Sequence, residues 1–179
     1  MKAKTQGFAG QIIHYSPANG LGHVARHPLG VGLHVKCLGW YPKAQGHVIQ
    51  RPNGLDECIL ILCTKGKGWA EIDGIRSAVA ANQVLFIPAN KPHAYGADDK
   101  DPWSIHWAHF SGTEAASYAI MLPVREYVLS IPAADAKEIA DMFRESYRSA
   151  SSGLTQRTLL LVSHTCLLYT SPSPRDRTR

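Results

Sequence analysis

Between residues 51 and 107 the chain carries side chains suited to binding a small polar molecule. Arg51 precedes a proline, which favours an extended backbone and presents the guanidinium as a fork of N–H donors. His93 and Tyr95 are two residues apart and so share one face of a strand, as Ile105 and Trp107 do further along. An indole can stack on the C–H face of a sugar ring while a guanidinium and a phenol bind its hydroxyls. These residues predict a site for a sugar or a similar polyol.

A simpler interpretation stays open for each of these residues taken singly. Trp103 and Trp107 could fill the core, as large aromatic side chains mostly do, and Arg51 could lie on the surface. The recurrence of polar and aromatic groups on successive strands favours the binding site over this alternative.

The histidines do not form the pattern of a metal site. A metal-binding barrel of this size needs two histidines two apart on one strand, a carboxylate, and a third histidine on a later strand. His93 could be the late histidine, but no histidine lies between Arg51 and Cys58. His106 and His109 are three apart and so point to opposite faces of a strand. We therefore expect no metal and no other cofactor, and interpret these histidines as hydrogen-bonded or surface residues.

Catalytic motifs are missing as well. The chain has no Gly-x-Ser-x-Gly turn, and none of its cysteines has a histidine in a recognisable local setting. Gly66-Lys67-Gly68 joins two strands and indicates a turn, not a phosphate-binding loop. We predict that the protein is not an enzyme and has no catalytic residue.

Residues 166–179 break abruptly from the apolar pattern before them. They match the translation of a common transposon-based sequencing adapter, so we interpret them as a non-native tail and expect the native gene to continue past Thr165. A natural Ser/Pro-rich basic tail is the alternative. The tail holds three arginines and one aspartate, a net +2, so the formal charge of +5 falls to +3 without it. The basic composition is therefore a weak argument for nucleic-acid binding by this region.

Cysteine usage and hydropathy indicate the cellular compartment of the protein. Cys37, Cys58 and Cys63 form no CxxC pair and read as buried free thiols, which suits a reducing compartment. The chain shows no signal peptide and no apolar run of membrane-spanning length. We expect a cytoplasmic protein with no membrane partner.

Short strands bounded by Gly- and Pro-bearing turns must position the site residues. The pattern predicts about eight strands, a number that closes a small barrel or jelly roll able to enclose a small molecule. Asp73-Gly74 predicts a type I′ hairpin turn, because both turn residues need positive φ. The clearest segments are 34–41, 47–51, 58–63, 69–76, 84–87 and 103–110.

Helical periodicity follows the strands. A helix is predicted from about Pro132 to residue 151, with Asp135 as its cap, and a second, strongly apolar helix from about Thr155. The fold class is thus mainly β, a small jelly-roll β-barrel followed by two α-helices. The predicted regions are an N-terminal arm (1–35), a barrel (36–112), a truncated helical region (113–165) and the tail (166–179).

The chain up to Thr165 resembles the N-terminal domain of AraC-type transcription regulators. The resemblance implies that residues 36–112 form a cupin β-barrel that binds an effector and that residues 113–165 form a truncated helical dimerisation region, through which two copies make a homodimer. It also implies DNA contact only through a further C-terminal domain with two helix-turn-helix units, which this sequence lacks. The motifs that carry it are Phe8-Ala9-Gly10-Gln11, His27-Pro28-Leu29, Gly39-Trp40-Tyr41-Pro42-Lys43-Ala44, Gly46-His47, Arg51-Pro52-x-Gly54, Ile59-Leu60-Ile61, Gly66-x-Gly68-Trp69, Pro92-His93-Ala94-Tyr95-Gly96 and Pro102-Trp103-Ser104-Ile105-x-Trp107-x-His109-Phe110-x-Gly112.

The resemblance also implies particular ligand contacts. Residues that approach the sugar in the family's arabinose-binding member correspond to Arg51, Tyr95 and Trp107, and a small polar residue of that member falls close to Tyr41. A sugar-contacting histidine of the family aligns with Ile105, so this chain departs from the family there. The departure argues against arabinose as the ligand but not against a pocket.

These observations favour the effector-sensing and dimerisation domain of an AraC-type regulator, with a small molecule such as a sugar as its partner. Two alternatives remain: a cupin-type metal-dependent enzyme acting on a small sugar or acid, and a stand-alone small-molecule-binding module. Bound metal would favour the enzyme, and helix-turn-helix coding sequence after Thr165 would favour the regulator.

Overall fold

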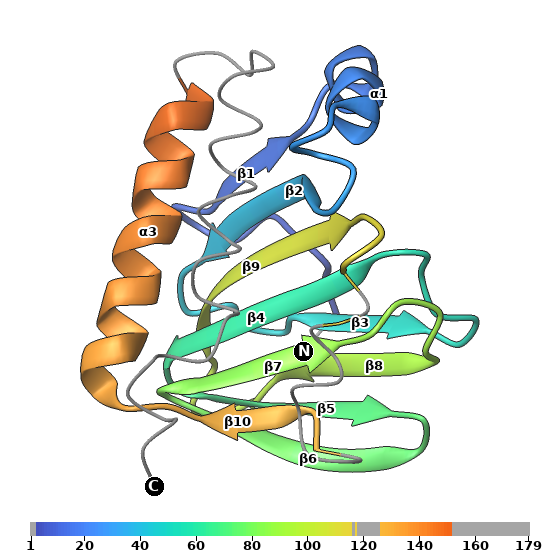
Figure 1. Cartoon of the computed structure of the whole chain (residues 1–179). Helices are drawn as coiled ribbons and strands as arrows, with labels where there is room; N and C mark the ends of the chain where they lie inside the picture. Colours follow the sequence, from blue (N-terminus) through green and yellow to red (C-terminus); the bar gives the residue numbers. More distant parts are fainter. Residues whose placement is uncertain (1–2, 116, 118–125, 152–179) are drawn as a thin grey trace, which may run out of the picture.

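Two antiparallel sheets face each other and enclose the main core (Figure 1). The computed structural model describes residues 3–115, 117 and 126–151. The six-stranded sheet has the order β1-β2-β9-β4-β7-β10 and the four-stranded sheet the order β3-β8-β5-β6. The strands are β1 (Ile12–Tyr15), β2 (His34–Tyr41), β3 (Val48–Arg51), β4 (Cys58–Lys65), β5 (Lys67–Ile72), β6 (Ile75–Ala80), β7 (Gln83–Ile87), β8 (His93–Ala97), β9 (Ser104–Ser111) and β10 (Val128–Ser130); the helices are α1 (Ala18–Arg26) and α3 (Ala133–Ser151). The predicted mainly-β architecture, with a helix after the strands, is confirmed.

Strand β4 shows why its sequence is continuously apolar. Ile59, Ile61 and Cys63 point between the two sheets, where they belong to the main core. Leu62 and its outward-facing neighbours lie on the other face of the six-stranded sheet, beneath α3. A strand covered on both faces has no exposed side on which to place polar residues. The buried thiols of β4 are free, as predicted.

The β5–β6 hairpin closes with the predicted turn. Asp73 and Gly74 have φ angles of 49° and 77°, so both turn residues adopt the left-handed region that a type I′ turn requires. The pairing of Ile72 with Ile75 places the two residues immediately beside the turn opposite each other.

Helix α3 lies across the outer face of the six-stranded sheet (Figure 1). It buries Phe143 and Tyr147 in a second apolar cluster with residues of β2, β4 and β9. The helix begins at Ala133, two residues earlier than the predicted cap, so Asp135 lies in its first turn. A carboxylate there still favours the helix, because the amino-terminal end carries partial positive charge. The second predicted helix and the tail lie outside the described residues.

Two edge strands account for the difference between about eight predicted strands and the ten that the described residues contain. Strand β1 lies within the segment predicted as an arm and pairs with β2, so this part of the chain is built into the sheet. Strand β10 lies within the segment predicted as helical and pairs with β7. Both are short and depend on a neighbour for their hydrogen bonds, which leaves little pattern in their own sequences. Neither α1 nor α3 has the length and apolar character needed to cross a membrane.

Candidate functional site

A cavity of about 460 Å³ opens between the two sheets. This volume falls within the range typical of small-molecule sites. Strands of both sheets contribute to its wall, and Thr5 and Gln6 of the N-terminal segment complete one side. The residues that line it are Thr5, Gln6, Tyr15, Lys36, Cys37, Tyr41, His47, Ile49, Arg51, Leu55, Glu57, Ile61, Tyr95, Ile105, Trp107 and His109.

Five of the six residues predicted to bind ligand lie on this wall. Arg51 and Tyr95 come from the four-stranded sheet, where β3 pairs with β8. Tyr41, Ile105 and Trp107 come from β2 and β9 of the facing sheet.

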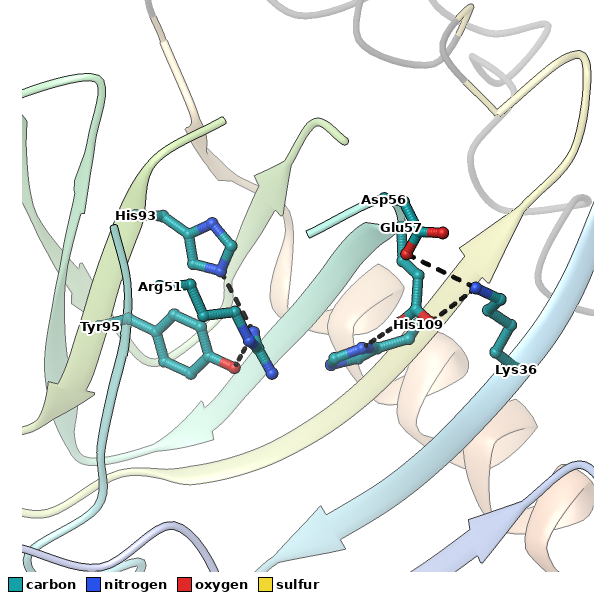
Figure 2. A network of polar contacts seen from close by, with 7 residues as sticks. All are labelled: Lys36, Arg51, Asp56, Glu57, His93, Tyr95 and His109. Carbon is teal, nitrogen blue, oxygen red and sulfur yellow. Dashed lines mark hydrogen bonds and ion pairs between the residues drawn. The ribbon is translucent and has the colours of Figure 1, made fainter. Parts of the chain in front are cut away.

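The sixth predicted residue, His93, does not line the cavity but forms a hydrogen bond with Arg51, which does. The register of β3 and β8 sets His93 directly opposite Arg51. The Nε2 of His93 is 3.2 Å from Nη1 of Arg51, and the same nitrogen of Arg51 lies 3.5 Å from the hydroxyl of Tyr95 (Figure 2). The Nδ1 of His93 lies 2.7 Å from the carbonyl oxygen of Lys91, which can only accept, so Nδ1 carries the proton and Nε2 accepts from Arg51. Burial lowers the pKa of His93, and the positive charge of Arg51 lowers it further.

A second polar group faces the cavity from the six-stranded sheet. Glu57 accepts from Nδ1 of His109 at 2.7 Å and from Lys36 at 2.8 Å (Figure 2). Burial alone would raise the pKa of Glu57, but the hydrogen bonds from His109 and Lys36 outweigh it and lower the pKa to about 2. The carboxylate is therefore ionised at neutral pH.

Sequence reasoning missed this second group. His109 is two residues from Trp107 and so shares its face of β9, which is the signal that could have found it. Lys36 and Glu57 come from two different segments and carry no local pattern that links them to His109. Their association exists only because β2, β4 and β9 are neighbours in the sheet.

Aromatic rings line the remaining wall. Trp107 packs against Tyr41, with ring centroids 5.4 Å apart, and its indole N–H is buried without a hydrogen-bond partner among the described residues. Trp103 is completely buried and donates its indole N–H to Nδ1 of His47, so it fills the core as the simpler interpretation held. Burial and the charge of Arg51 lower the pKa of His47 to about 4, which keeps this ring neutral at physiological pH.

His106 and His109 point to opposite faces of β9, as their spacing predicts. His109 faces the cavity, whereas His106 is buried under α3 and lies 2.8 Å from the hydroxyl of Tyr147. Among the described residues, no group of three or more histidine, cysteine or acidic side chains is placed to hold a metal ion.

Among the described residues, the thiol on the cavity wall is not an activated nucleophile. Burial raises the pKa of Cys37, the thiol on the cavity wall, to about 12, so this thiol stays protonated. Burial also raises the pKa of the phenols of Tyr41 and Tyr95, which therefore remain hydrogen-bonding groups. The wall combines donors, one acceptor carboxylate and aromatic faces, the composition of a site for a small polar molecule.

Residues 38–164 match the family described as the AraC-like ligand binding domain. This match covers more than half of the chain. The chain belongs to this family. The MmsAB operon regulatory protein of Pseudomonas aeruginosa is 35% identical over 108 residues, which are 55% of this chain and 33% of that protein. The chain thus spans about a third of the length of this relative. Membership of the family supports a regulatory, ligand-sensing domain.

Solved structures aligned with this AraC-like domain are distant from it. YhaK from Escherichia coli is 13% identical, with a TM-score of 0.43, over 68% of this chain and 50% of that one. A cupin superfamily protein from Desulfitobacterium hafniense is 14% identical, with a TM-score of 0.36, over 62% of this chain and 82% of that one. KdgF from Halomonas sp. is 17% identical, with a TM-score of 0.35, over 45% of this chain and 69% of that one.

Proposed function

We propose that this chain is the effector-sensing and dimerisation domain of an AraC-type regulator, and that it binds a small polar molecule such as a sugar between its two sheets. The observation that carries the proposal is the convergence of Arg51, Tyr95 and Trp107, from both sheets, on one cavity of about 460 Å³. A guanidinium, a phenol and an indole on facing walls supply directional hydrogen bonds and a flat apolar surface.

The effector would act by binding two arrangements of the domain with different affinity. The ring of Trp107 rests against Gly39 of β2, and the carbonyl oxygen of Gly39 accepts a hydrogen bond from Tyr147 of α3. A ligand that moves the indole therefore acts on the strand to which α3 is attached. In the proposed dimer, formed through α3 and the following segment that the sequence predicts to be helical, this shift changes the spacing of the two copies.

The N-terminal segment is a second element that ligand can influence. Thr5 and Gln6 line the cavity, and Lys4 pairs with the backbone of residues 46 and 48 beside β3. We propose that a bound effector holds this segment in place. Deleting residues 1–6, which leaves the buried Phe8 and strand β1 in place, should then abolish effector-linked changes in an intact regulator. If those changes persist, the segment has no part in signalling.

The relative's printed name describes an operon regulatory protein, and this chain covers a third of it. We propose that DNA contact belongs to another part of such a longer protein, and that the present domain senses without catalysis. Sedimentation of the purified chain tests the dimer: a monomer at all concentrations would contradict it.

Ligand binding can be mapped by titrating the 179-residue chain with small polyols, among them L-arabinose and glycerol, and following its indole and amide NMR signals. Perturbation centred on Trp107, Tyr95 and Arg51 is the expected result. Trp107→Phe should weaken polyol binding. Trp69→Phe should not, because the ring of Trp69 is partly exposed and packs under Arg76. Perturbation confined to residues outside the cavity would refute the proposed site.

A further inference from the structure

The charge of Arg51 is not balanced within the described part of the protein. Arg51 is partly buried, and its hydrogen-bond partners are the neutral ring of His93 and the phenol of Tyr95. Both bonds use Nη1, so the N–H groups of Nη2 and Nε have no partner among the described residues, and no described carboxylate forms an ion pair with Arg51. A guanidinium removed from water without an anion is costly, because burial penalises the charged form.

The other charged residues of the cavity do not supply the missing anion. Glu57 is the one acidic residue on the wall, and both of its oxygens are already bonded, one to Lys36 and one to His109. Asp56 also approaches Lys36, at 3.8 Å, but its side chain is 78% exposed on the outside, where solvent screens it. Lys36 and Arg51 are positive and Glu57 is negative, so these three side chains carry one positive charge in excess. Because Glu57 is bonded to Lys36, the charge without a counterion lies on Arg51.

A neutral sugar would hydrogen-bond to Arg51 but would leave this charge uncompensated. A carboxylate presents two oxygens that match the guanidinium fork and adds the missing negative charge. The opposite wall suits a hydroxylated molecule, because each oxygen of Glu57 keeps a lone pair beyond its bond to Lys36 or His109. His109 also directs its second ring nitrogen away from that carboxylate. Figure 2 shows the guanidinium extending from the β3–β8 side toward this wall.

We propose that the effector is a small organic acid, a hydroxylated carboxylate such as a hydroxy acid or a sugar acid, with its carboxylate bound to Arg51. This inference rests on the proposed function and narrows it from polar molecules in general to anions. It also gives His93 a role, since a neutral His93 that accepts from Nη1 leaves Nη2 and Nε to the ligand.

The test uses a matched pair of probes at constant ionic strength, lactate and lactamide, in which a neutral amide of similar size replaces the carboxylate. Each is titrated into the 179-residue chain while the Arg51 side-chain and Trp107 indole NMR signals are followed. Lactate should shift both signals and lactamide should not. Arg51→Gln should weaken lactate binding by about tenfold or more, because a charge-assisted pair is lost. Arg51→Lys should retain a preference for lactate with lower affinity, since it keeps the charge but not the fork.

Arg76→Gln is the matched control, because Arg76 is 60% exposed and pairs with Glu71 on the surface. It should leave the lactate response unchanged. Equal shifts with lactate and lactamide, a lactate response that survives Arg51→Gln, or no response of the cavity to lactate would each overturn the inference. Cavity shifts produced by lactamide or L-arabinose, but not by lactate, would overturn it while leaving the proposed sensing function intact. Shifts located outside the cavity for every probe would refute both the organic-acid effector and the proposed sensing function.

Discussion

The hydroxyl of Tyr147 donates a hydrogen bond of 2.7 Å to the carbonyl oxygen of Gly39, and the indole of Trp107 packs against the same glycine. Gly39 thus lies between Tyr147 of helix α3, on the outer face of the sheet, and Trp107 of the cavity wall, on the inner face. A side chain at position 39 would fill the space that the indole occupies. The glycine is therefore required by close approach, and it joins the proposed ligand site to the helix packed outside the sheet.

Tyr147→Phe removes the hydroxyl from this contact. The change leaves the buried carbonyl of Gly39 and the ring of His106 without their partner, so the free energy of unfolding should fall by about 1–3 kcal/mol. Urea unfolding measures the change. Tyr15→Phe is the control, because Tyr15 is 64% exposed and should cost little. A loss for Tyr147→Phe as small as that for Tyr15→Phe would contradict a stabilising role of the Tyr147 hydroxyl.

Gly39→Ala should displace Trp107. A Cβ at this position would lie 2.5 Å from Cζ2 of the indole and 2.6 Å from the carbonyl oxygen of Ile12. We expect a loss of about 1–3 kcal/mol, as for other overpacked core positions, with a shift in tryptophan fluorescence and weaker effector binding. Gly22→Ala in α1 is the control, because its nearest neighbour is the side chain of Arg26 at 3.7 Å. That variant should be neutral or slightly stabilising; unchanged Gly39→Ala fluorescence would contradict the packing argument.

Glu57→Gln should reduce stability in a pH-dependent way. The folded pKa of Glu57, about 2, lies below its ordinary value of 4.5, so the ionised carboxylate stabilises the fold above pH 4.5 and this contribution is lost as the pH falls toward 2. We expect the variant to be less stable by about 2 kcal/mol at neutral pH, a figure reduced for partial exposure to solvent. The difference should shrink on acidification.

Urea titrations of wild type and Glu57→Gln near neutral pH and in acid measure this difference. Glu71→Gln is the control, because Glu71 pairs with Arg76 at 3.5 Å with both side chains largely exposed, so the change should stay within about 0.5 kcal/mol. A Glu57→Gln deficit that does not change with pH would show that the paired charge is not its source.

His106 should make the fold sensitive to mild acid. Burial lowers its folded pKa to about 4 from the ordinary 6.5, and the nearby charges of Arg144 and Asp141 act in opposite directions. Below pH 6.5 the unfolded chain binds a proton that the folded chain does not, so stability present above pH 6.5 declines as the pH falls toward 4.

His106→Phe preserves the stacking with Trp40 and Phe143 but cannot titrate. The variant should be less stable than wild type at neutral pH, because it loses the bond to Tyr147. Between pH 6.5 and 4, however, the free energy of unfolding of the variant should fall by less than that of wild type, by up to about 3 kcal/mol. Urea midpoints measured across this range provide the test. Parallel pH curves for the two proteins would contradict the assignment.

Much of the fold could be predicted from local patterns. Strand β4 was predictable because an unbroken apolar run indicates burial on both faces, and the β5–β6 turn because Asp73-Gly74 favours positive φ. The edge strands β1 and β10 were not, because their hydrogen bonds come from β2 and β7. The start of α3 was predicted to within one residue, but Asp135 lies in its first turn and not at the cap, because a carboxylate is favourable in both places.

The amino-acid sequence by itself determined which residues share a strand face, because side chains alternate along any strand. Trp107 and His109 therefore point to the same face of β9. Only the tertiary structure decided which faces meet. Arg51 reaches His93 across 42 positions of the chain and Glu57 reaches His109 across 52, and both contacts depend on strand pairing that no local pattern specifies. The cavity and its charge arise between two sheets, so they exist once the strands are paired and not before.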